Sequence, residues 1–222
     1  MKEQATVQTS SFQMLRAMVG IGVLCGFLIV LTYEGTLPRV ERLKAEALEK
    51  AIFKVIPGIT ETRAFTYSDN TLRLSDDKTD SVVYAGYDDQ GNFKGVAIEA
   101  SGQGYADVIR ILYGYDPERQ QLIGFYVLES KETPGLGDKI EKDEKFLANF
   151  SALDVLLTDD FKRIVNKVIP VKNSTKQNPW EVDGITGATI SSRAIGNIIG
   201  SSTEVWIPIM YQNQEFLRDI KR

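Results

Sequence analysis

The most constraining feature of this chain is an apolar run near its start, AMVGIGVLCGFLIVLTY at residues 17–33, which holds no charged side chain. Its length is close to the lower limit of about 17 residues for a helix that crosses a bilayer. Lys2 and Arg16 precede the run and Glu34 follows it, and cations favour the cytoplasmic side of a membrane. We therefore predict a cytoplasmic segment over 1–16, a single transmembrane helix over 17–33, and the remaining chain on the periplasmic, extracytoplasmic side of the inner membrane.

Two alternatives for this run are a cleaved signal peptide and a buried core helix. No small-x-small pair follows the run at a clean boundary, and Leu24 stands before Cys25, where a lipoprotein signal needs a small residue. A buried core helix is disfavoured because the run is apolar all round and is interrupted by Gly20, Gly22 and Gly26. An uncleaved membrane anchor is therefore expected, and the three glycines would let it dock closely against other membrane helices.

The composition excludes several classes of protein. With 26 Lys and Arg against 30 Asp and Glu, the net charge of −4 argues against a nucleic-acid-binding protein, which needs a basic face to meet phosphates. The chain has no histidine and only one cysteine, Cys25, so it can build neither a Ser-His-Asp triad nor a metal site ligated by histidines or by several cysteines. We therefore expect no catalytic residue and no metal ligand, and any redox chemistry requires an organic cofactor.

The residues after the apolar run predict one domain of mixed structure. Residues 39–56 place apolar side chains on one helical stripe up to Pro57-Gly58, so a stalk helix is expected within 34–58 and a domain over 59–222. From about residue 81 the apolar period changes to two, which is typical of strands. Four strands of an antiparallel sheet are expected at 81–88, 93–101, 107–116 and 122–130, with turns at 88–92 and 116–120.

Helices are expected to flank this sheet. Residues 190–206 repeat apolar side chains with a helical period and predict a helix. Residues 141–150 and 158–169 mix charge with spaced apolar residues, so each is a candidate short helix, and the second could equally contain a strand. Strands with appended helices, without a regular βαβ alternation, indicate an α+β fold.

A short motif before the last predicted helix is the strongest candidate for a binding site. Residues 183–192 read DGITGATISS, in which two glycines and Ala188 form a permissive turn that delivers Thr189 to the start of a helix. The unpaired N–H groups of a helix start attract an anion, most often a phosphate. On spacing alone, the simpler interpretation is a plain turn in which Thr189 is the N-cap of the helix.

Two further glycine-containing stretches precede the motif. Residues 132–137 read ETPGLG, where Pro-Gly predicts a turn and the glycines would let backbone approach a ligand. Residues 102–105 read GQGY, a glycine turn before a strand. On residues alone, the first stretch is equally a surface loop, and Tyr105 is equally a half-buried strand aromatic.

Together, the three stretches resemble a known family. DGITGAT, ETPGLG and GQGY are similar to sequences of the covalent FMN-binding domains of two membrane complexes, the Rnf ion-pumping electron-transport complex and the sodium-pumping NADH:quinone reductase. The resemblance covers about residues 81–200. The N-terminal anchor, the order of the stretches, the chain length and Ala106 favour the G subunit of Rnf. The C subunit of the sodium-pumping reductase is the alternative.

The resemblance implies roles for individual residues of this chain. Thr189 would carry FMN through a phosphoester bond, made from FAD by a dedicated flavin transferase that recognises its target partly through Asp183. The loop at 132–137 would lie against the isoalloxazine ring. The cofactor-binding residues implied in this way are Asp183, Gly184, Thr186, Gly187, Ala188, Thr189, Glu132, Thr133, Gly135, Leu136, Gly104 and Tyr105.

Four other side chains near these stretches are candidates for a supporting role. Lys139, Lys142 and Arg193 are possible partners of the phosphate, although each is also an ordinary surface cation. Trp180 could either cover the flavin ring or fill the core.

The function implied by the resemblance is that of a membrane-anchored electron-transfer subunit that is not catalytic alone. Its covalent FMN would relay electrons between ferredoxin and NAD in an ion-translocating complex. The expected partners are the membrane, the integral membrane, iron–sulfur and flavin subunits of that complex, and the flavin transferase. A different class of function, a non-redox anchored module that binds or supports other proteins, is the alternative.

Overall fold

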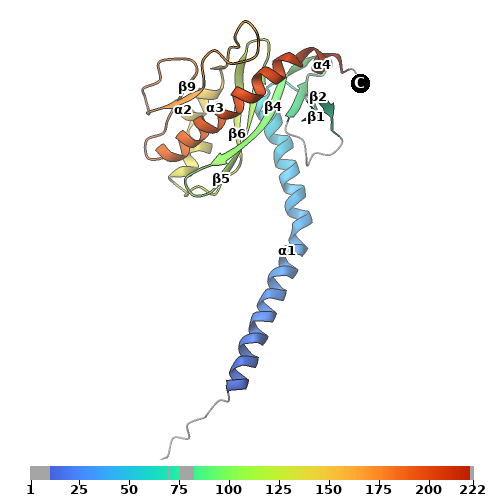
Figure 1. Cartoon of the computed structure of the whole chain (residues 1–222), viewed down its shortest axis with the longest axis vertical. Helices are drawn as coiled ribbons and strands as arrows, with labels where there is room; N and C mark the ends of the chain where they lie inside the picture. The colour runs from blue at the N-terminus through green and yellow to red at the C-terminus, as the bar shows by residue number, and fades with distance from the viewer. Residues whose placement is uncertain (1–10, 70, 76–82, 221–222) are drawn as a thin grey trace, which may run out of the picture. The chain divides into compact units, whose positions relative to one another are not determined.

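The computed structural model describes residues 11–69, 71–75 and 83–220. The chain divides into two compact units, Met1–Glu46 and Ala47–Arg222. The first unit contains most of the long helix α1, and the second contains the end of α1, both sheets and the remaining helices (Figure 1).

Helix α1 spans Ser11–Val55 and continues through Pro38, so the predicted transmembrane and stalk ranges lie in one helix. Among the described residues it is the one helix long and apolar enough to cross a membrane, judged by length and composition. None of its most apolar window is buried within the structure, as expected for a surface that lipid covers. The helix ends just before Pro57 and Gly58, and Gly58 has a φ of +80°, which confirms the predicted stop.

The second unit is built on a seven-stranded antiparallel sheet, which confirms the predicted α+β fold. Its four central strands form a meander and lie close to the predicted ranges: β3 (Val83–Tyr87), β4 (Phe93–Gln103), β5 (Val108–Asp116) and β6 (Gln121–Glu129). Three strands that the apolar pattern did not predict extend the sheet at its edges: β1 (Glu61–Ser68), β2 (Thr71–Leu74) and β7 (Leu153–Asp154). The strand order is β2-β1-β3-β4-β5-β6-β7.

Shorter elements connect this sheet to the last helices. The short helix expected within 141–150 is confirmed, because η1 (Gly137–Glu141), α2 (Glu144–Leu147) and η2 (Ala148–Phe150) follow one another there. Residues 158–169 contain no helix, and only the start of a strand falls in this range. A small parallel sheet of β8 (Ile169–Val171) and β9 (Glu181–Asp183) leads into α3 (Thr189–Gln212) and α4 (Gln214–Asp219).

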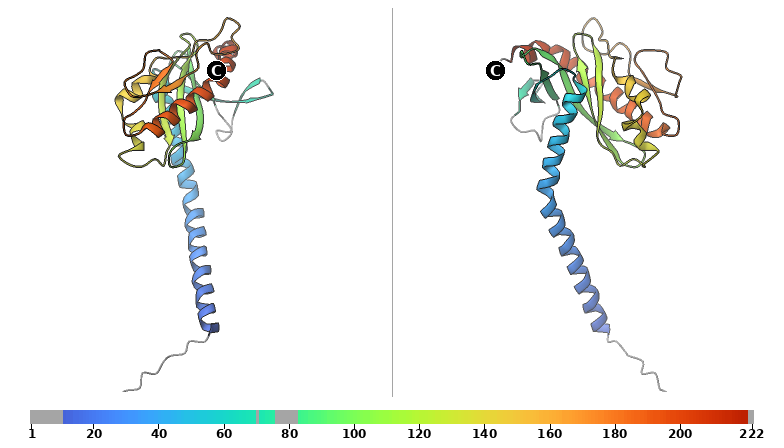
Figure 2. Two further views of the ribbon diagram at one scale, coloured as in Figure 1. Left: turned by 60° about the vertical axis from the view of Figure 1, so that its left-hand side comes forward. Right: turned by 180° about the vertical axis from the view of Figure 1, so that it is seen from behind.

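The two faces of the large sheet bury different partners. Because side chains alternate along a strand, Val83 and Ala85 point to one face and Tyr84 points to the other. The first face belongs to the main core, which α3 covers with Ile195 and Ile199. The second face packs against the last turns of α1, as the opposite views of Figure 1 and the right panel of Figure 2 show.

The end of α1 lies directly on the sheet. Gly114 of β5 and Gly124 of β6 are register partners, and a Cβ atom on them would lie 2.0 and 2.4 Å from the Val55 carbonyl oxygen. Only glycine allows backbone to approach this closely. The last turns of α1 are therefore part of the core of the second unit.

Candidate functional site

The turn that precedes α3 has the features of a type II β-turn. The N–H of Ala188 donates to the carbonyl oxygen of Ile185 at 3.1 Å, and Gly187, at the third turn position, has a φ of +83°. This position of a type II turn needs a positive φ, which glycine adopts without strain. The turn leaves the side chains of Thr186 and Thr189 exposed.

Helix α3 begins without a side-chain cap. Its N-cap residue is Ala188, which has no oxygen to offer, and Thr189 is the first residue inside the helix. The interpretation in which Thr189 caps the helix is therefore wrong. Among the described residues, no acceptor meets the N–H groups of Thr189, Ile190 or Ser191. These three donors and the helix dipole together form a surface that favours an anion next to the Thr189 hydroxyl.

The motif is held in place by contacts on both sides of the turn. The hydroxyl of Ser192 accepts from the N–H of Ile185 at 3.1 Å, which ties the turn to the first turn of α3. Gly184 donates its N–H to the carbonyl oxygen of Val171 at 3.1 Å, and a Cβ atom on Gly184 would lie 2.9 Å from that oxygen. The small parallel sheet therefore positions the turn.

Two predicted site residues of the motif hold a neighbouring loop. The carboxylate of Asp183 accepts from the N–H groups of Ser174 at 2.9 Å and Thr175 at 3.1 Å. The hydroxyl of Thr186 accepts from the side-chain amide of Asn173 at 2.7 Å. Asp183 and Thr186 thus stabilise the loop at 173–175 beside the motif, and their contact with a cofactor or transferase stays a prediction.

The ETPGLG stretch also contains a type II turn. The N–H of Leu136 donates to the carbonyl oxygen of Thr133 at 3.1 Å, and Gly135 has a φ of +78°. The carboxylate of Asp138 accepts from the N–H of Gly135 at 2.7 Å and fixes the turn. Leu136 lies at the tip with 55% of its side chain exposed, so this turn presents an apolar side chain at the surface.

Glu132 joins this loop to the other two stretches. Its Oε1 accepts from the N–H groups of Tyr105 at 2.8 Å and Ala106 at 3.0 Å, and its Oε2 accepts from the Ser191 hydroxyl at 2.5 Å. Only 6% of Glu132 is exposed. The three stretches singled out in the sequence therefore meet at one buried carboxylate at the start of α3.

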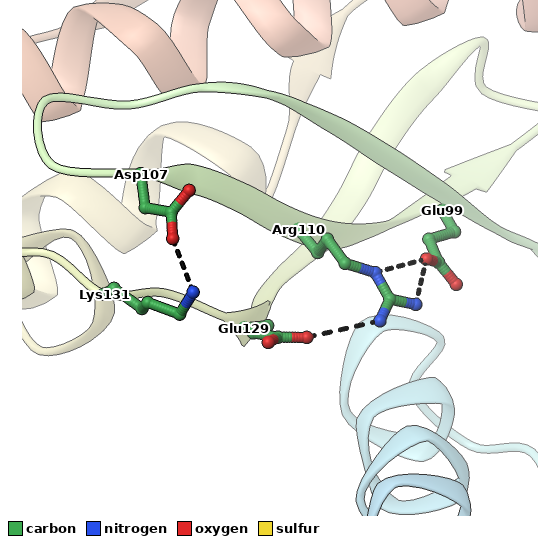
Figure 3. A network of polar contacts seen from close by, with 5 residues as sticks. All are labelled: Glu99, Asp107, Arg110, Glu129 and Lys131. Carbon is green, nitrogen blue, oxygen red and sulfur yellow. Dashed lines mark hydrogen bonds and ion pairs between the residues drawn. The ribbon is translucent and has the colours of Figure 1, made fainter. Parts of the chain in front are cut away.

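Ion pairs reinforce the ends of the strands next to this point (Figure 3). Lys131 pairs with Asp107 at 2.5 Å, and Arg110 of β5 bridges Glu99 of β4 and Glu129 of β6. The hydrogen bond from Lys131 is the main cause that lowers the pKa of Asp107, and the hydrogen bond to Glu99 likewise raises the pKa of Arg110. Arg110 thus joins three strands of the sheet, and the pair of Lys131 and Asp107 joins the segments that precede Glu132 and follow Tyr105.

The candidate supporting cations differ in their placement. The ammonium of Lys139 would lie 3.5 Å from a Cβ atom built on Gly187, so it is beside the turn that precedes Thr189. Lys142 pairs with Asp138 at 2.6 Å, and Arg193 is exposed on α3. Of these three candidate cations, Lys139 is the one that lies beside the turn.

Two aromatic residues near the site, Tyr105 and Trp180, had alternative interpretations in the sequence. Tyr105 is 66% exposed and is not a half-buried strand aromatic. Trp180 is partly buried and belongs to neither described core cluster, so it does not fill the core.

Ser191 and Ser192 were not predicted as site residues, although both stand inside the quoted motif. Their hydroxyls contribute through hydrogen bonds to Glu132 and Ile185, which form only in the folded chain.

Comparisons with known proteins agree with this geometry. A family model described as an FMN-binding domain matches residues 104–203, which include the three stretches from Gly104 onward. The chain is 31% identical over 188 residues to the G subunit of the ion-translocating oxidoreductase complex of Methanosarcina acetivorans, covering 84% of this chain and 89% of the relative. It is 27% identical over 214 residues to the protein of the same name from Haemophilus influenzae strain PittEE, covering 90% and 93%.

The fold is also similar to a solved structure. The C subunit of the Na(+)-translocating NADH-quinone reductase from Parabacteroides distasonis superposes with a TM-score of 0.58 at 18% sequence identity, covering 82% of this chain and 98% of that chain. This similarity concerns the fold alone. The extent and level of identity to the curated relatives decide the family: the chain belongs to the family of G subunits of ion-translocating oxidoreductase complexes.

Proposed function

We propose that this chain is the membrane-anchored flavoprotein subunit of an Rnf-type ferredoxin:NAD oxidoreductase, and that its FMN is attached to Thr189 by a phosphoester bond. One observation carries the proposal: Thr189 is exposed at the first position of a 24-residue helix whose N-cap is an alanine. If the turn had only a structural role, a capping side chain would stabilise the helix and its absence would have no benefit. A phosphate attached to Thr189 can instead accept hydrogen bonds from the free N–H groups at the start of α3.

The residues around Thr189 fit a phosphodiester. Such a group keeps one negative charge, which the N-terminal end of α3 stabilises. The ammonium of Lys139 would lie 3.5 Å from a Cβ atom on Gly187, and Gly187 has no side chain to block the approach of the phosphate. The exposed side chains of Tyr105 and Leu136 offer apolar surface for a flat ring.

The attachment reaction balances with FAD as the donor. The Thr189 oxygen would bond to the FMN phosphorus while the pyrophosphate bond of FAD breaks, AMP leaves with the bridging oxygen, and the hydroxyl proton is released. The flavin transferase would catalyse this step, since the chain has no histidine to act as base. The expected role of Asp183 in recognition by the transferase is part of this proposal.

When bound, FMN supplies the capacity to accept and release electrons, which this chain's own side chains lack. The chain's residues would hold the phosphate, orient the ring and limit its mobility. A permanent bond keeps the cofactor at a fixed high local concentration. This matters because we place the domain on the extracytoplasmic side of the inner membrane, where free FMN would be lost.

The expected partners follow from the family. Helix α1 would anchor the chain as a single span and pack against the integral membrane subunits, with Gly20, Gly22 and Gly26 allowing close approach. The iron–sulfur and flavin subunits of the complex would exchange electrons with the FMN.

The test is to produce the full chain together with a flavin transferase. Wild type should give a fluorescent band that survives SDS, and an intact mass raised by one FMN less one water, localised to the Thr189 peptide. Thr189→Ala should show neither. Ser201→Ala, which removes an exposed hydroxyl further along α3 and outside the motif, is the control and should keep both signals.

The same assay examines Lys139. Lys139→Gln should slow the attachment of flavin by about 2- to 5-fold, the range expected for a partly exposed charge contact. Lys145→Gln, which removes an exposed cation of α2, should leave the rate unchanged. A wild-type chain that stays colourless after maturation with an active transferase would contradict the proposed function.

A further inference from the structure

The geometry points to Glu132 as a positioning residue, whose buried carboxylate holds the three segments of the flavin site in one arrangement. The segments are the turn at 104–106, the loop at 132–137 and the first turn of α3. This inference rests on the proposed function, because it concerns the orientation of a flavin attached to Thr189. It differs from the contact that family resemblance implies, since Glu132 would act through its neighbours rather than touch the ring.

The hydrogen bonds of Glu132 are all made to these segments. One carboxylate oxygen accepts from the backbone N–H groups of Tyr105 and Ala106, and the other accepts from the hydroxyl of Ser191. No cation pairs with Glu132 in the part of the chain that the structure describes. A buried carboxylate in this position depends on its donors, so its arrangement and theirs are fixed together.

Two glycines make room for this carboxylate. A Cβ atom on Gly104 would lie 2.4 Å from Oε1 of Glu132, and one on Gly137 would lie 2.5 Å from Oε2. The Cβ on Gly137 would also lie 3.0 Å from the hydroxyl of Ser191. Gly104 belongs to the GQGY stretch and Gly137 to the ETPGLG stretch. Their lack of a side chain leaves space for the Glu132 carboxylate rather than for a ligand.

The segments that Glu132 joins carry the surface features of the candidate site. Tyr105 is 66% exposed and follows Gly104, while Leu136 is 55% exposed at the tip of the neighbouring loop. Thr189 lies two residues before Ser191 in α3. Glu132 therefore sets the positions of both exposed apolar side chains relative to the point of attachment.

The nearby ion pair cannot replace this function. Lys131 and Asp107 connect the same two loops, as Figure 3 shows, but their side chains are 69% and 41% exposed. Exposed pairs contribute little to stability, whereas leaving buried donors without an acceptor is costly. The buried carboxylate is the stronger constraint on the arrangement.

The experiment uses the full chain matured with the flavin transferase, and fluorescence in SDS gels first establishes attachment. Glu132→Ala should still carry flavin, because Thr189 is intact. Its visible circular dichroism and flavin fluorescence anisotropy should fall towards those of a freely tethered flavin. Glu132→Gln should restore most of both signals, since its amide can accept from the two N–H groups and donate to Ser191.

Asp88, in the turn between β3 and β4, offers a control outside the flavin site. Its side chain is 13% exposed, and it accepts from the N–H groups of Gln90 at 3.0 Å and Asn92 at 2.8 Å and from the Asn92 amide. Asp88→Ala thus removes two hydrogen bonds from backbone and one from a side chain, as Glu132→Ala does. It should lower thermal stability and leave the flavin signals of wild type unchanged.

Several outcomes would overturn the inference. Wild-type flavin signals in a folded Glu132→Ala chain, or an equal loss in Asp88→Ala, would contradict the positioning role. Should Glu132→Ala not fold, Ser191→Ala removes a single contact, and it must show a smaller decrease in the same signals. Absence of flavin from the wild-type chain would instead contradict the proposed function.

Discussion

Ala188 stands at the N-cap of α3, where Ser, Thr, Asp or Asn would be worth about 1 kcal/mol to the helix. The residue that could have served as a cap, Thr189, lies one position further on and is exposed. A local rule is thus broken at the place where the family resemblance puts the cofactor bond. Violations of this kind are expected at functional sites, where another interaction compensates for them.

This arrangement predicts a trade-off at Ala188. Ala188→Ser should raise the free energy of unfolding of the chain without flavin by about 0.5–1 kcal/mol, because the hydroxyl can accept from the free N–H groups. The same hydroxyl should slow flavin attachment, since it occupies the donors that the phosphate needs. Urea unfolding in detergent and the rate of gain of fluorescence in SDS gels measure the two effects.

Ala194→Ser is the control for that experiment, because it adds a hydroxyl nearly two turns further along α3, out of reach of the free N–H groups. It should show no gain in stability and no change in attachment rate. An Ala188→Ser chain with the wild-type attachment rate would count against the use of these donors by phosphate.

At the scale of elements, α4 is fastened to the sheet through β1 and β3. The hydroxyl of Tyr87 donates to the carbonyl oxygen of Leu217 at 2.8 Å, and Arg63 donates to the carbonyl oxygen of Ile220 at 2.9 Å. The Arg63 guanidinium also lies 5.1 Å from the centroid of the Tyr87 ring. The Tyr87 side chain therefore links α4 to strand β3 of the large sheet.

This link predicts loss of stability at high pH. Burial is the main cause that raises the pKa of Tyr87 to about 12, whereas an unfolded tyrosine titrates near pH 10. The stabilisation from the neutral hydroxyl is fully present below about pH 10 and is lost as the pH rises through about 12. Urea unfolding followed between these values should show the decline.

Tyr87→Phe separates this contribution from general alkaline unfolding. The variant should lose about 1 kcal/mol at neutral pH, because it removes one buried hydrogen bond. It should also show a shallower decline above pH 10 than wild type. Equal slopes in the two chains would mean that Tyr87 does not titrate as described.

At the scale of the whole molecule, the two units differ in which apolar surfaces they expose and bury. The first exposes an apolar helical surface, and the second contains both hydrophobic clusters and every residue of the candidate site. The boundary between the two units lies within α1 and not at its end. Ala51, Ile52 and Val55 belong to the hydrophobic cluster on the second face of the large sheet, the face that contains Tyr84.

Two truncations test this division. A chain that begins at Ala47 should be released from membranes, fold, and accept flavin at Thr189, because it keeps both clusters. A chain that begins at Pro57 should be strongly destabilised or fail to fold, since it exposes the apolar face that α1 covers. Thermal unfolding and fluorescence in SDS gels distinguish the two. Equal stability of both would show that the end of α1 is dispensable.

The apolar pattern alone determined much of this architecture. The membrane-spanning candidate follows from an uncharged apolar run and the four central strands follow from an apolar period of two. Both are local properties that can be read from the sequence without knowing the tertiary neighbours. The hairpin of β1 and β2 was missed because its residues are mostly half-exposed or exposed, so no clean alternation marks it. The glycine turns before Thr189 and at Gly135 were also predictable, because a positive φ has few alternatives to glycine.

Only the tertiary structure decided how these pieces form a site. Glu132 and Ser191 are 59 positions apart, and Glu132 and Tyr105 are 27 apart, so no local pattern links them. The need for glycine at 104 and 137 becomes clear only from the position of the Glu132 carboxylate between them. Periodicity reports which face of an element is buried, whereas the partner of a buried polar atom depends on the complete packing of the chain.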